Sequence, residues 1–316
     1  MHVPDVAPEL AIEHVEYLHD PFAVSIRFAH VLAVSALFAL IYLRLALALV
    51  AGKTSWVVLG WSALLIWSLF LAVSGKASAG TQANFWFSQV FVSAALNLSS
   101  LDLGTLSSWL YWHLNGQAQW TMFHVMLAGM MFVFSFALLL ANLSRISIRL
   151  SQLSWASSLG RAAFVLSLTL LIAAVMTWPG AFDDPSNSVQ ATPNYVPAQI
   201  IPEWYLSPWF EMLRSGSNRA AGSKILWAAL LLPMLLSALF RGRRYPLGIA
   251  MTLATGLLAI DFIALSVFGR SSPILSSHLP ISWLTAYYFL YFLLIIPALA
   301  FLDTRAKHLQ AGVDVP

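Results

Sequence analysis

The chain has 316 residues, of which 59% are hydrophobic and 9% charged, and its formal net charge is +3. A soluble domain has roughly a quarter of its residues charged, so water is not the main solvent for this chain. The basic balance is typical of membrane proteins with basic cytoplasmic loops, and we expect no nucleic-acid binding. Because cysteine is absent, disulfides, iron–sulfur ligation by this chain and thiol catalysis are excluded.

Seven stretches are long and apolar enough to cross a hydrocarbon core about 30 Å thick, which takes roughly 20 residues of helix. They are residues 22–50, 55–74, 119–143, 162–178, 225–240, 246–269 and 280–302. Within lipid, only helices and closed barrels satisfy the backbone, and these runs lack the alternation of barrel strands. The sequence therefore predicts an all-α integral membrane protein with about seven transmembrane helices.

The basic residues near the span ends predict the orientation of the chain. With the N-terminus outside, ten of them lie on the inner side and six on the outer side. We therefore expect an outside N-terminus and a cytoplasmic C-terminus in a bacterial-type cytoplasmic membrane. The N-terminal segment has neither a basic stretch nor an apolar one, so it does not read as a cleaved signal peptide.

The predicted spans divide the chain into four parts. These are an outer N-terminal segment (1–21), a four-helix part (22–178), a long outer loop (179–224) and a C-terminal three-helix part (225–316). The loop between the second and third spans also lies outside, and its aromatic stretch FWFSQVFVSAALNL is typical of a helix at the membrane interface. The long outer loops indicate a functional surface on the outside.

Eight histidines are present, but only His30 and His124 lie clearly inside predicted spans. Ionisable residues inside a membrane are costly and are functional candidates. The first and third spans run in the same direction, and the helical rise places the two histidines within about 5 Å of the same depth. Two imidazoles at one depth on facing helices suit the axial positions of haem iron. The alternative is that each histidine only forms hydrogen bonds inside the bundle.

Arg27 lies three residues before His30 and on the same helical face. Its guanidinium could pair with a haem propionate nearer the outer surface. The alternative is an interfacial arginine that extends toward the headgroups.

The long outer loop contains Pro202-Glu203-Trp204-Tyr205, followed by Leu213-Arg214-Ser215. These segments resemble the PEWY and ILRS segments of cytochrome b from respiratory and photosynthetic cytochrome bc complexes, and they stand between spans four and five, as in that family. The later segment FRGRRYPLG and Asp261 within a span agree with the family as well. By itself, the PEWY motif is also compatible with an interfacial aromatic anchor and a capping acid.

The resemblance extends to the first span, where Arg27-Phe28-Ala29-His30 is similar to the family's second helix. That helix and the family's fourth helix each carry another histidine fourteen residues later, and here those positions are Arg44 and Leu138. Fourteen residues of helix span about 21 Å, so the family's two haems lie one above the other across the membrane. The resemblance implies one b-type haem, the outer low-potential one, held by His30 and His124. It also implies loss of the inner haem and of the family's first helix.

The resemblance implies an outer quinone site as well. Glu203 and Tyr205 would be its catalytic residues, with Glu203 accepting or relaying a quinol proton. Pro202, Trp204 and Gln82 would contact the quinone. Residues 79–81 read AGT where the family has proline-tryptophan-glycine, so the pocket would differ in shape.

These resemblances favour a mono-haem cytochrome b-like subunit, embedded in membrane lipid, that transfers electrons between quinone or quinol and a partner redox protein on the outer side. The partner would be an iron–sulfur or cytochrome c-type protein, and a homodimer is compatible with the family. One alternative is a redox-inactive structural anchor of a membrane respiratory complex. Another alternative is a transporter that uses Asp261, but no inverted repeat supports it. Without a transport role, Asp261 is interpreted as an ordinary buried partner of other residues in the bundle.

Overall fold

The computed structural model describes residues 21–78, 81–82, 84–87, 90, 120–136, 200–240, 248–271 and 281–310. Five helices in this part are long and apolar enough to cross a membrane, and they correspond to the first, second, fifth, sixth and seventh predicted spans. The third corresponds to a shorter apolar helix at Trp120–Phe136. The fourth, residues 162–178, lies outside the described residues. The all-α, multi-pass prediction is confirmed.

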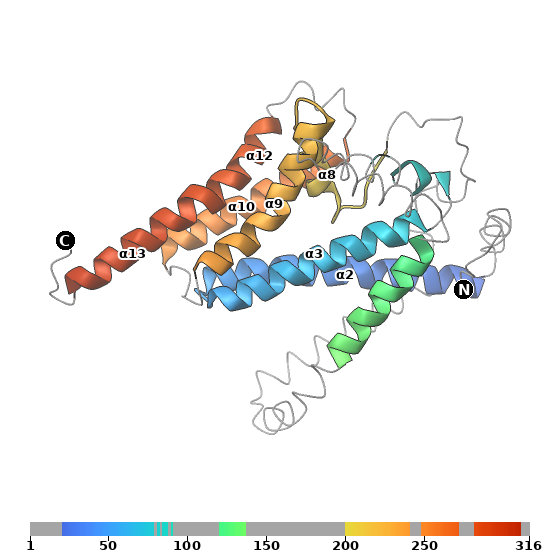
Figure 1. The fold of residues 1–316 in the computed structure, drawn as a ribbon, viewed down its shortest axis with the longest axis horizontal. Coiled ribbons are helices and arrows are strands. Elements are labelled where there is room, and N and C mark those ends of the chain that lie inside the picture. The colour runs from blue at the N-terminus through green and yellow to red at the C-terminus, as the bar shows by residue number, and fades with distance from the viewer. Residues whose placement is uncertain are drawn as a thin grey trace, which may run out of the picture. The chain divides into compact units, whose positions relative to one another are not determined.

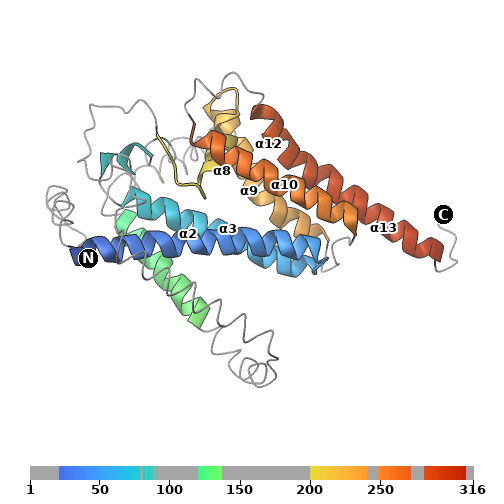
Figure 2. The ribbon, with the colours of Figure 1, turned by 180° about the vertical axis from the view of Figure 1, so that it is seen from behind.

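The first two helices form a hairpin. α2 (Pro21–Val50) and α3 (Ser55–Ala77) are joined by residues 51–54. Gly52 has a φ of 55°, which glycine adopts without a Cβ penalty, and the amide of Lys53 donates to the carbonyl of Ala48 at 3.0 Å. A connection this short makes the helices antiparallel neighbours, and both ribbon views show them side by side (Figures 1 and 2).

The chain divides into two compact units. The first contains residues 1–34, 74–85 and 116–192, and the second contains residues 35–73, 86–115 and 193–316. The two intramembrane histidines therefore belong to the first unit. The PEWY motif belongs to the second.

The second unit is built around a short helix that carries the end of the PEWY loop. Its C-terminal elements are α8 (Ser207–Arg214), α9 (Arg219–Leu239), α10 (Ile249–Gly269), α12 (Ile281–Leu290), η4 (Tyr291–Ile295) and α13 (Ile296–Gln310). α8 packs against α9 and α10, and α10 also packs against α12 (Figure 2). The contact between α8 and α10 requires a glycine, because a Cβ at Gly269 would collide with the carbonyl oxygen of Ser207.

Two helices of this unit depart from the predicted spans. α9 begins at Arg219 rather than at residue 225, because the Asn218 side chain caps it by accepting from the amide of Ala221 at 2.9 Å. Its first turns are polar, so hydropathy alone excludes them from the span. The last span contains a π-helical turn, η4. Pro297 stands two residues after its end and lacks the amide that a regular helix needs.

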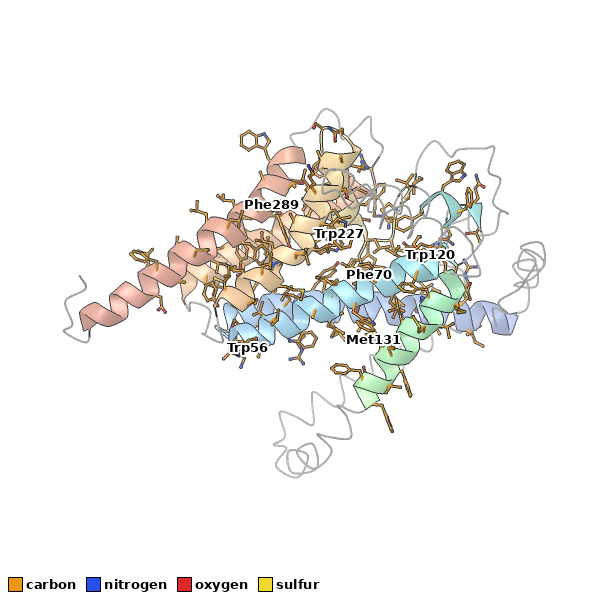
Figure 3. The ribbon with its side chains drawn as sticks, in the orientation of Figure 1. Trp56, Phe70, Trp120, Met131, Trp227 and Phe289 are labelled. Carbon is orange, nitrogen blue, oxygen red and sulfur yellow. The ribbon has the colours of Figure 1, made fainter. Side chains whose placement is uncertain are left out.

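Aromatic rings and internal hydrogen bonds join the helices of the second unit. Phe70 on α3 lies near Trp227 on α9, with ring centroids 6.0 Å apart (Figure 3). The hydroxyl of Tyr288 on α12 donates to the carbonyl of Ala229 on α9 at 2.8 Å. Because lipid offers no hydrogen-bond partners, polar side chains in a span are stable when another helix satisfies them.

Candidate functional site

In the first unit, the structure brings His30 on α2 close to His124 on the helix at Trp120–Phe136. Their ring centroids are 6.5 Å apart, and the ring planes are inclined at 80°. Two metal–nitrogen bonds of about 2 Å, together with the ring radii, would separate two imidazole centroids by roughly 6 Å. The spacing therefore suits two imidazoles that share one iron.

The end of α3 positions the ring of His124. Ser74 Oγ lies 3.2 Å from His124 Nδ1, and a Cβ built on Gly75 would stand 2.8 Å from His124 Cε1. The imidazole thus packs directly on the backbone of α3. When Nδ1 carries the proton and donates it to Ser74, Nε2 keeps the lone pair that a metal ligand needs. Sequence reasoning missed Ser74 and Gly75, whose only signal is a pair of small residues near a helix end.

The surroundings of the pair fit a haem. His30 is exposed and Arg27, one helical turn before it, is half-buried. Within the described ranges, no group of three or more His, Cys, Asp or Glu side chains is placed to hold a metal ion. Two imidazoles are nevertheless a complete axial set for haem iron, since the porphyrin supplies the other ligands.

The other positions singled out in the sequence fall in different places. Gln82 is buried in the first unit, whereas residues 79–80 and Leu138 lie outside the described residues. Arg44 is exposed on the part of α2 that belongs to the second unit. An exposed arginine near a helix end can extend its guanidinium toward the headgroups.

In the second unit, the first half of the PEWY motif is fixed by its backbone carbonyls. Pro202 is buried and its carbonyl accepts from Arg270 Nη1 at 3.1 Å and from Ser207 Oγ at 3.2 Å. The carbonyl of Glu203 accepts from the amide of Ser207 at 2.9 Å and from its hydroxyl at 2.8 Å. These bonds turn the chain into α8 and leave Glu203 half-buried.

The second half of the motif is fixed by two other helices. Ser266 on α10 donates to the carbonyl of Trp204 at 2.8 Å, and Tyr42 on α2 donates to the carbonyl of Tyr205 at 2.8 Å. The same Tyr42 hydroxyl accepts from Trp209 Nε1 at 2.9 Å. All four carbonyls of the motif thus accept hydrogen bonds, which fix the backbone of the segment.

The side chains of Trp204 and Tyr205 have different environments. The ring of Tyr205 is buried and stacks on Phe38 of α2, with centroids 4.3 Å apart and planes inclined at 5°. Trp204 remains 38% exposed. Burial raises the pKa of the Tyr205 phenol, and the charge of Glu203 raises it further. Tyr205 is therefore a neutral hydrogen-bonding group rather than a base.

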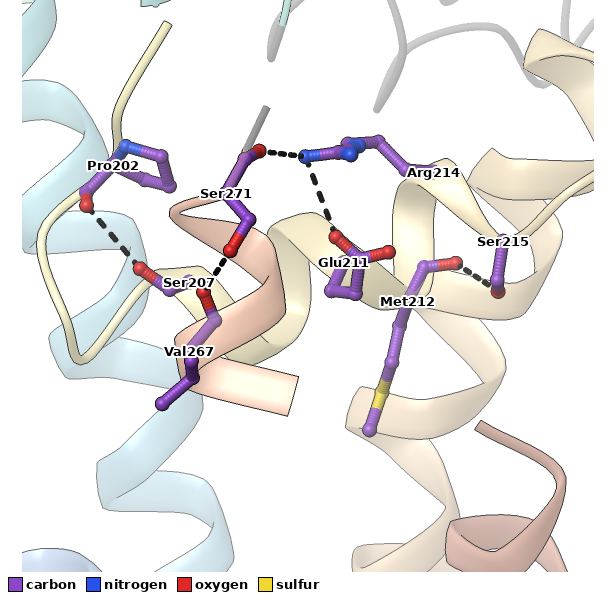
Figure 4. Close-up of polar contacts among 8 residues, drawn as sticks. All are labelled: Pro202, Ser207, Glu211, Met212, Arg214, Ser215, Val267 and Ser271. Carbon is purple, nitrogen blue, oxygen red and sulfur yellow. Dashed lines mark hydrogen bonds and ion pairs between the residues drawn. The ribbon is translucent and has the colours of Figure 1, made fainter. Parts of the chain in front are cut away.

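A buried carboxyl that sequence reasoning missed lies on α8 (Figure 4). Glu211 is 2% exposed, and its Oε2 lies 3.4 Å from Arg214 Nη1, which also donates to the carbonyl of Ser271 at 3.4 Å. The contact between Glu211 and Arg214 is an ion pair between residues three apart on α8. Burial raises the pKa of the Glu211 carboxyl, and Arg214 opposes that rise.

Comparisons with known proteins point to one family. Residues 190–289 match the family profile described as "Cytochrome b(C-terminal)/b6/petD". Cytochrome b of Schizophyllum commune is 34% identical over 147 residues, which cover 45% of this chain and 37% of the relative. Cytochrome b of Epidermophyton floccosum is 32% identical over 159 residues, with coverages of 45% and 35%. The chain therefore spans little more than a third of the length of these curated relatives.

A solved structure supports the fold over a longer range. A chain of a structure titled "Hyperthermophilic respiratory Complex III" superposes with a TM-score of 0.73 at 19% identity, covering 96% of this chain and 85% of that chain. At this identity the likeness concerns the fold alone. Taken together, the profile match, the two relatives and the PEWY segment show that the C-terminal part of this chain is similar to cytochrome b.

Proposed function

We propose that the chain is a mono-haem, cytochrome b-like membrane subunit that transfers electrons between quinone or quinol and a partner redox protein. The observation that supports this most directly is the His30–His124 pair, whose centroid spacing of 6.5 Å suits two axial ligands of one iron. A bound haem would supply one-electron redox chemistry. The chain's own residues would hold it, with His30 and His124 as ligands and Arg27 facing a propionate.

Ser74 and Gly75 have positioning roles in this proposal. The Ser74 hydroxyl, 3.2 Å from His124 Nδ1, would keep the proton on that nitrogen and so leave Nε2 for the metal. Gly75 leaves room for the imidazole, because any Cβ there would come within 2.8 Å of the ring. Both residues act through His124 rather than on the cofactor.

The quinone site would lie on the PEWY segment. Its four carbonyls are occupied by hydrogen bonds, including those from Arg270, Ser266 and Tyr42, so the backbone is held in one position. The half-buried Glu203 would accept a quinol proton, while the exposed ring of Trp204 and the buried Pro202 would flank the quinone. Tyr205 would complete the site, and the role expected for Gln82, which belongs to the first unit, stays a prediction.

The membrane orientation and the partners belong to the same proposal. We expect the N-terminus and the PEWY segment on the outer side of a bacterial-type cytoplasmic membrane and the C-terminus inside. An iron–sulfur or cytochrome c-type protein on the outer side would exchange electrons with the haem. Surrounding lipid and a second copy of the chain complete the expected assembly.

The ligand assignment is tested by optical spectra of purified His30→Ala and His124→Ala variants. Each is expected to lose the low-spin b-type spectrum that the unaltered chain shows. His308→Ala is the matched control, because His308 lies near the end of α13, beyond the candidate span that ends at Asp303. Retention of the spectrum in either ligand variant would contradict the assignment. Absence of haem from a preparation that retains its partners would favour the structural anchor.

The quinone site is tested separately with Glu203→Gln. This variant removes the proton-accepting carboxylate but keeps the size and hydrogen-bonding capacity of the side chain. It is expected to retain haem and to reduce quinol-driven haem reduction by about 10²-fold or more, as loss of a general base does. An unchanged rate would contradict the role of Glu203. Loss of haem would instead indicate a structural role.

A further inference from the structure

A second buried carboxyl lies inside a membrane-spanning helix, apart from the residues of the proposed function. Asp261 stands in the α10 span and is 6% exposed. It is on the buried face of α10 together with Thr255, Leu265 and Gly269. Ser266, five residues later, anchors the carbonyl of Trp204, so Asp261 lies about 8 Å deeper along the helix than the PEWY segment.

Both carboxyl oxygens of Asp261 lack a hydrogen-bond partner within the described part of the chain. Other polar groups of α10 do have partners there: Thr255 pairs with Tyr291 at 2.8 Å, and Ser266 with Trp204. Among the described residues, Asp261 is therefore not the ordinary buried hydrogen-bond partner that the sequence suggests. An ionised carboxylate in such a place would be deprived of both water and donors.

No described cation on the elements that contact α10 donates a hydrogen bond to Asp261. On α2, which contacts α10 through the rings of Tyr42 and Phe262, Arg44 is exposed. On α8, Arg214 pairs with Glu211. On α12, the hydroxyl of Tyr287 donates to the carbonyl of Ala254 and that of Tyr288 to the carbonyl of Ala229.

Neither η4 nor the part of α13 before Asp303 contains a cation. Tyr291 on η4 contacts Thr255 rather than Asp261. Asp303, the first charged residue of α13, follows Tyr291 by about 18 Å of helix.

We propose that Asp261 is an intramembrane proton-binding site. One carboxylate oxygen takes up one proton and forms an O–H bond, so the side chain resides in the span as a neutral carboxylic acid and no electron is transferred. In this form it is a proton donor placed about one and a half helical turns below the PEWY segment. The inference requires neither haem nor quinone binding, so its failure and that of the proposed function are distinguishable.

The test is infrared spectroscopy of the purified chain in buffer of about pH 6, where ordinary aspartates, with pKa values near 3.9, are ionised. A carbonyl stretch of a protonated carboxyl is expected in the unaltered protein and is expected to disappear in Asp261→Asn. Asp303→Asn, near the inner end of the last span, is the matched control and is expected to keep the band. Haem content should be equal in all three proteins.

A second measurement serves if Asp261→Asn does not fold. Carboxyl-labelled ¹³C-aspartate incorporated into the unaltered chain is expected to shift the protonated-carboxyl band, which assigns that band to an aspartate. No band, or a band unmoved by the label, would overturn the proposal and would indicate an ionised Asp261 with a cationic partner. A band that persists in Asp261→Asn would overturn it as well.

Discussion

Replacing Tyr42 with phenylalanine would remove a single hydroxyl that forms two hydrogen bonds. It donates to the carbonyl of Tyr205 at 2.8 Å and accepts from Trp209 Nε1 at 2.9 Å. Both partner residues are buried, so neither group gains water in exchange. Hydrogen bonds between helices in membranes contribute about 0.6 kcal/mol on average and up to about 1.7 kcal/mol. Loss of two bonds should therefore lower the free energy of unfolding by about 1–3 kcal/mol.

The assay is reversible unfolding of the purified protein in mixed micelles, with Tyr287→Phe as the matched control. Tyr287 donates one longer bond, 3.3 Å, to the carbonyl of Ala254. Its loss should cost about 0.6 kcal/mol or less. If Tyr42→Phe proves no more costly than Tyr287→Phe, Tyr42 does not hold the PEWY segment as described.

Three further substitutions follow from the structure. Gly75→Ala should displace His124 and lower the haem content of the purified chain, and a full haem content would contradict the packing described for that ring. Gly269→Ala should lower the free energy of unfolding by about 1–3 kcal/mol, because its Cβ meets the Ser207 carbonyl and overpacking is costly. The control Gly256→Ala, on the same helix with open space around it, should stabilise the protein by up to about 1 kcal/mol. Equal effects of the two substitutions would refute this reasoning. Burial raises the pKa of Glu211 above its ordinary value of 4.5, so its contribution to stability is fully present below that value and is lost as pH rises through the raised pKa. The melting temperature of Glu211→Gln should lack this decline, and parallel pH profiles for both proteins would argue against it.

Much of the fold can be predicted from the sequence, because lipid requires long apolar helices and hydropathy detects them directly. Helical rise and chain direction predict a common depth for His30 and His124, and the structure has their rings 6.5 Å apart. The early start of α9 could not be predicted from apolarity, because Asn218 and the polar residues after it are fixed by capping.

The supporting contacts could not be predicted, because they join residues far apart in the chain. Tyr42 contacts Tyr205 and Trp209 across more than 160 positions, and nothing in the local pattern of α2 indicates this. In the sequence, Glu211 is one polar residue of a predicted loop. Only the structure shows that it lies on α8 beside Arg214. Asp261 is visible in the sequence as an intramembrane acid, but only the packing of α10 reveals that its oxygens lack described donors.

The central claim is that this chain holds one haem between His30 and His124. A pyridine haemochrome assay of the purified chain, combined with its protein concentration, measures this ratio directly. The account predicts one b-type haem per chain and a single step in a redox titration. Two haems per chain would contradict the ligand assignment, and none, in a preparation that retains its partners, would contradict the electron-transfer role.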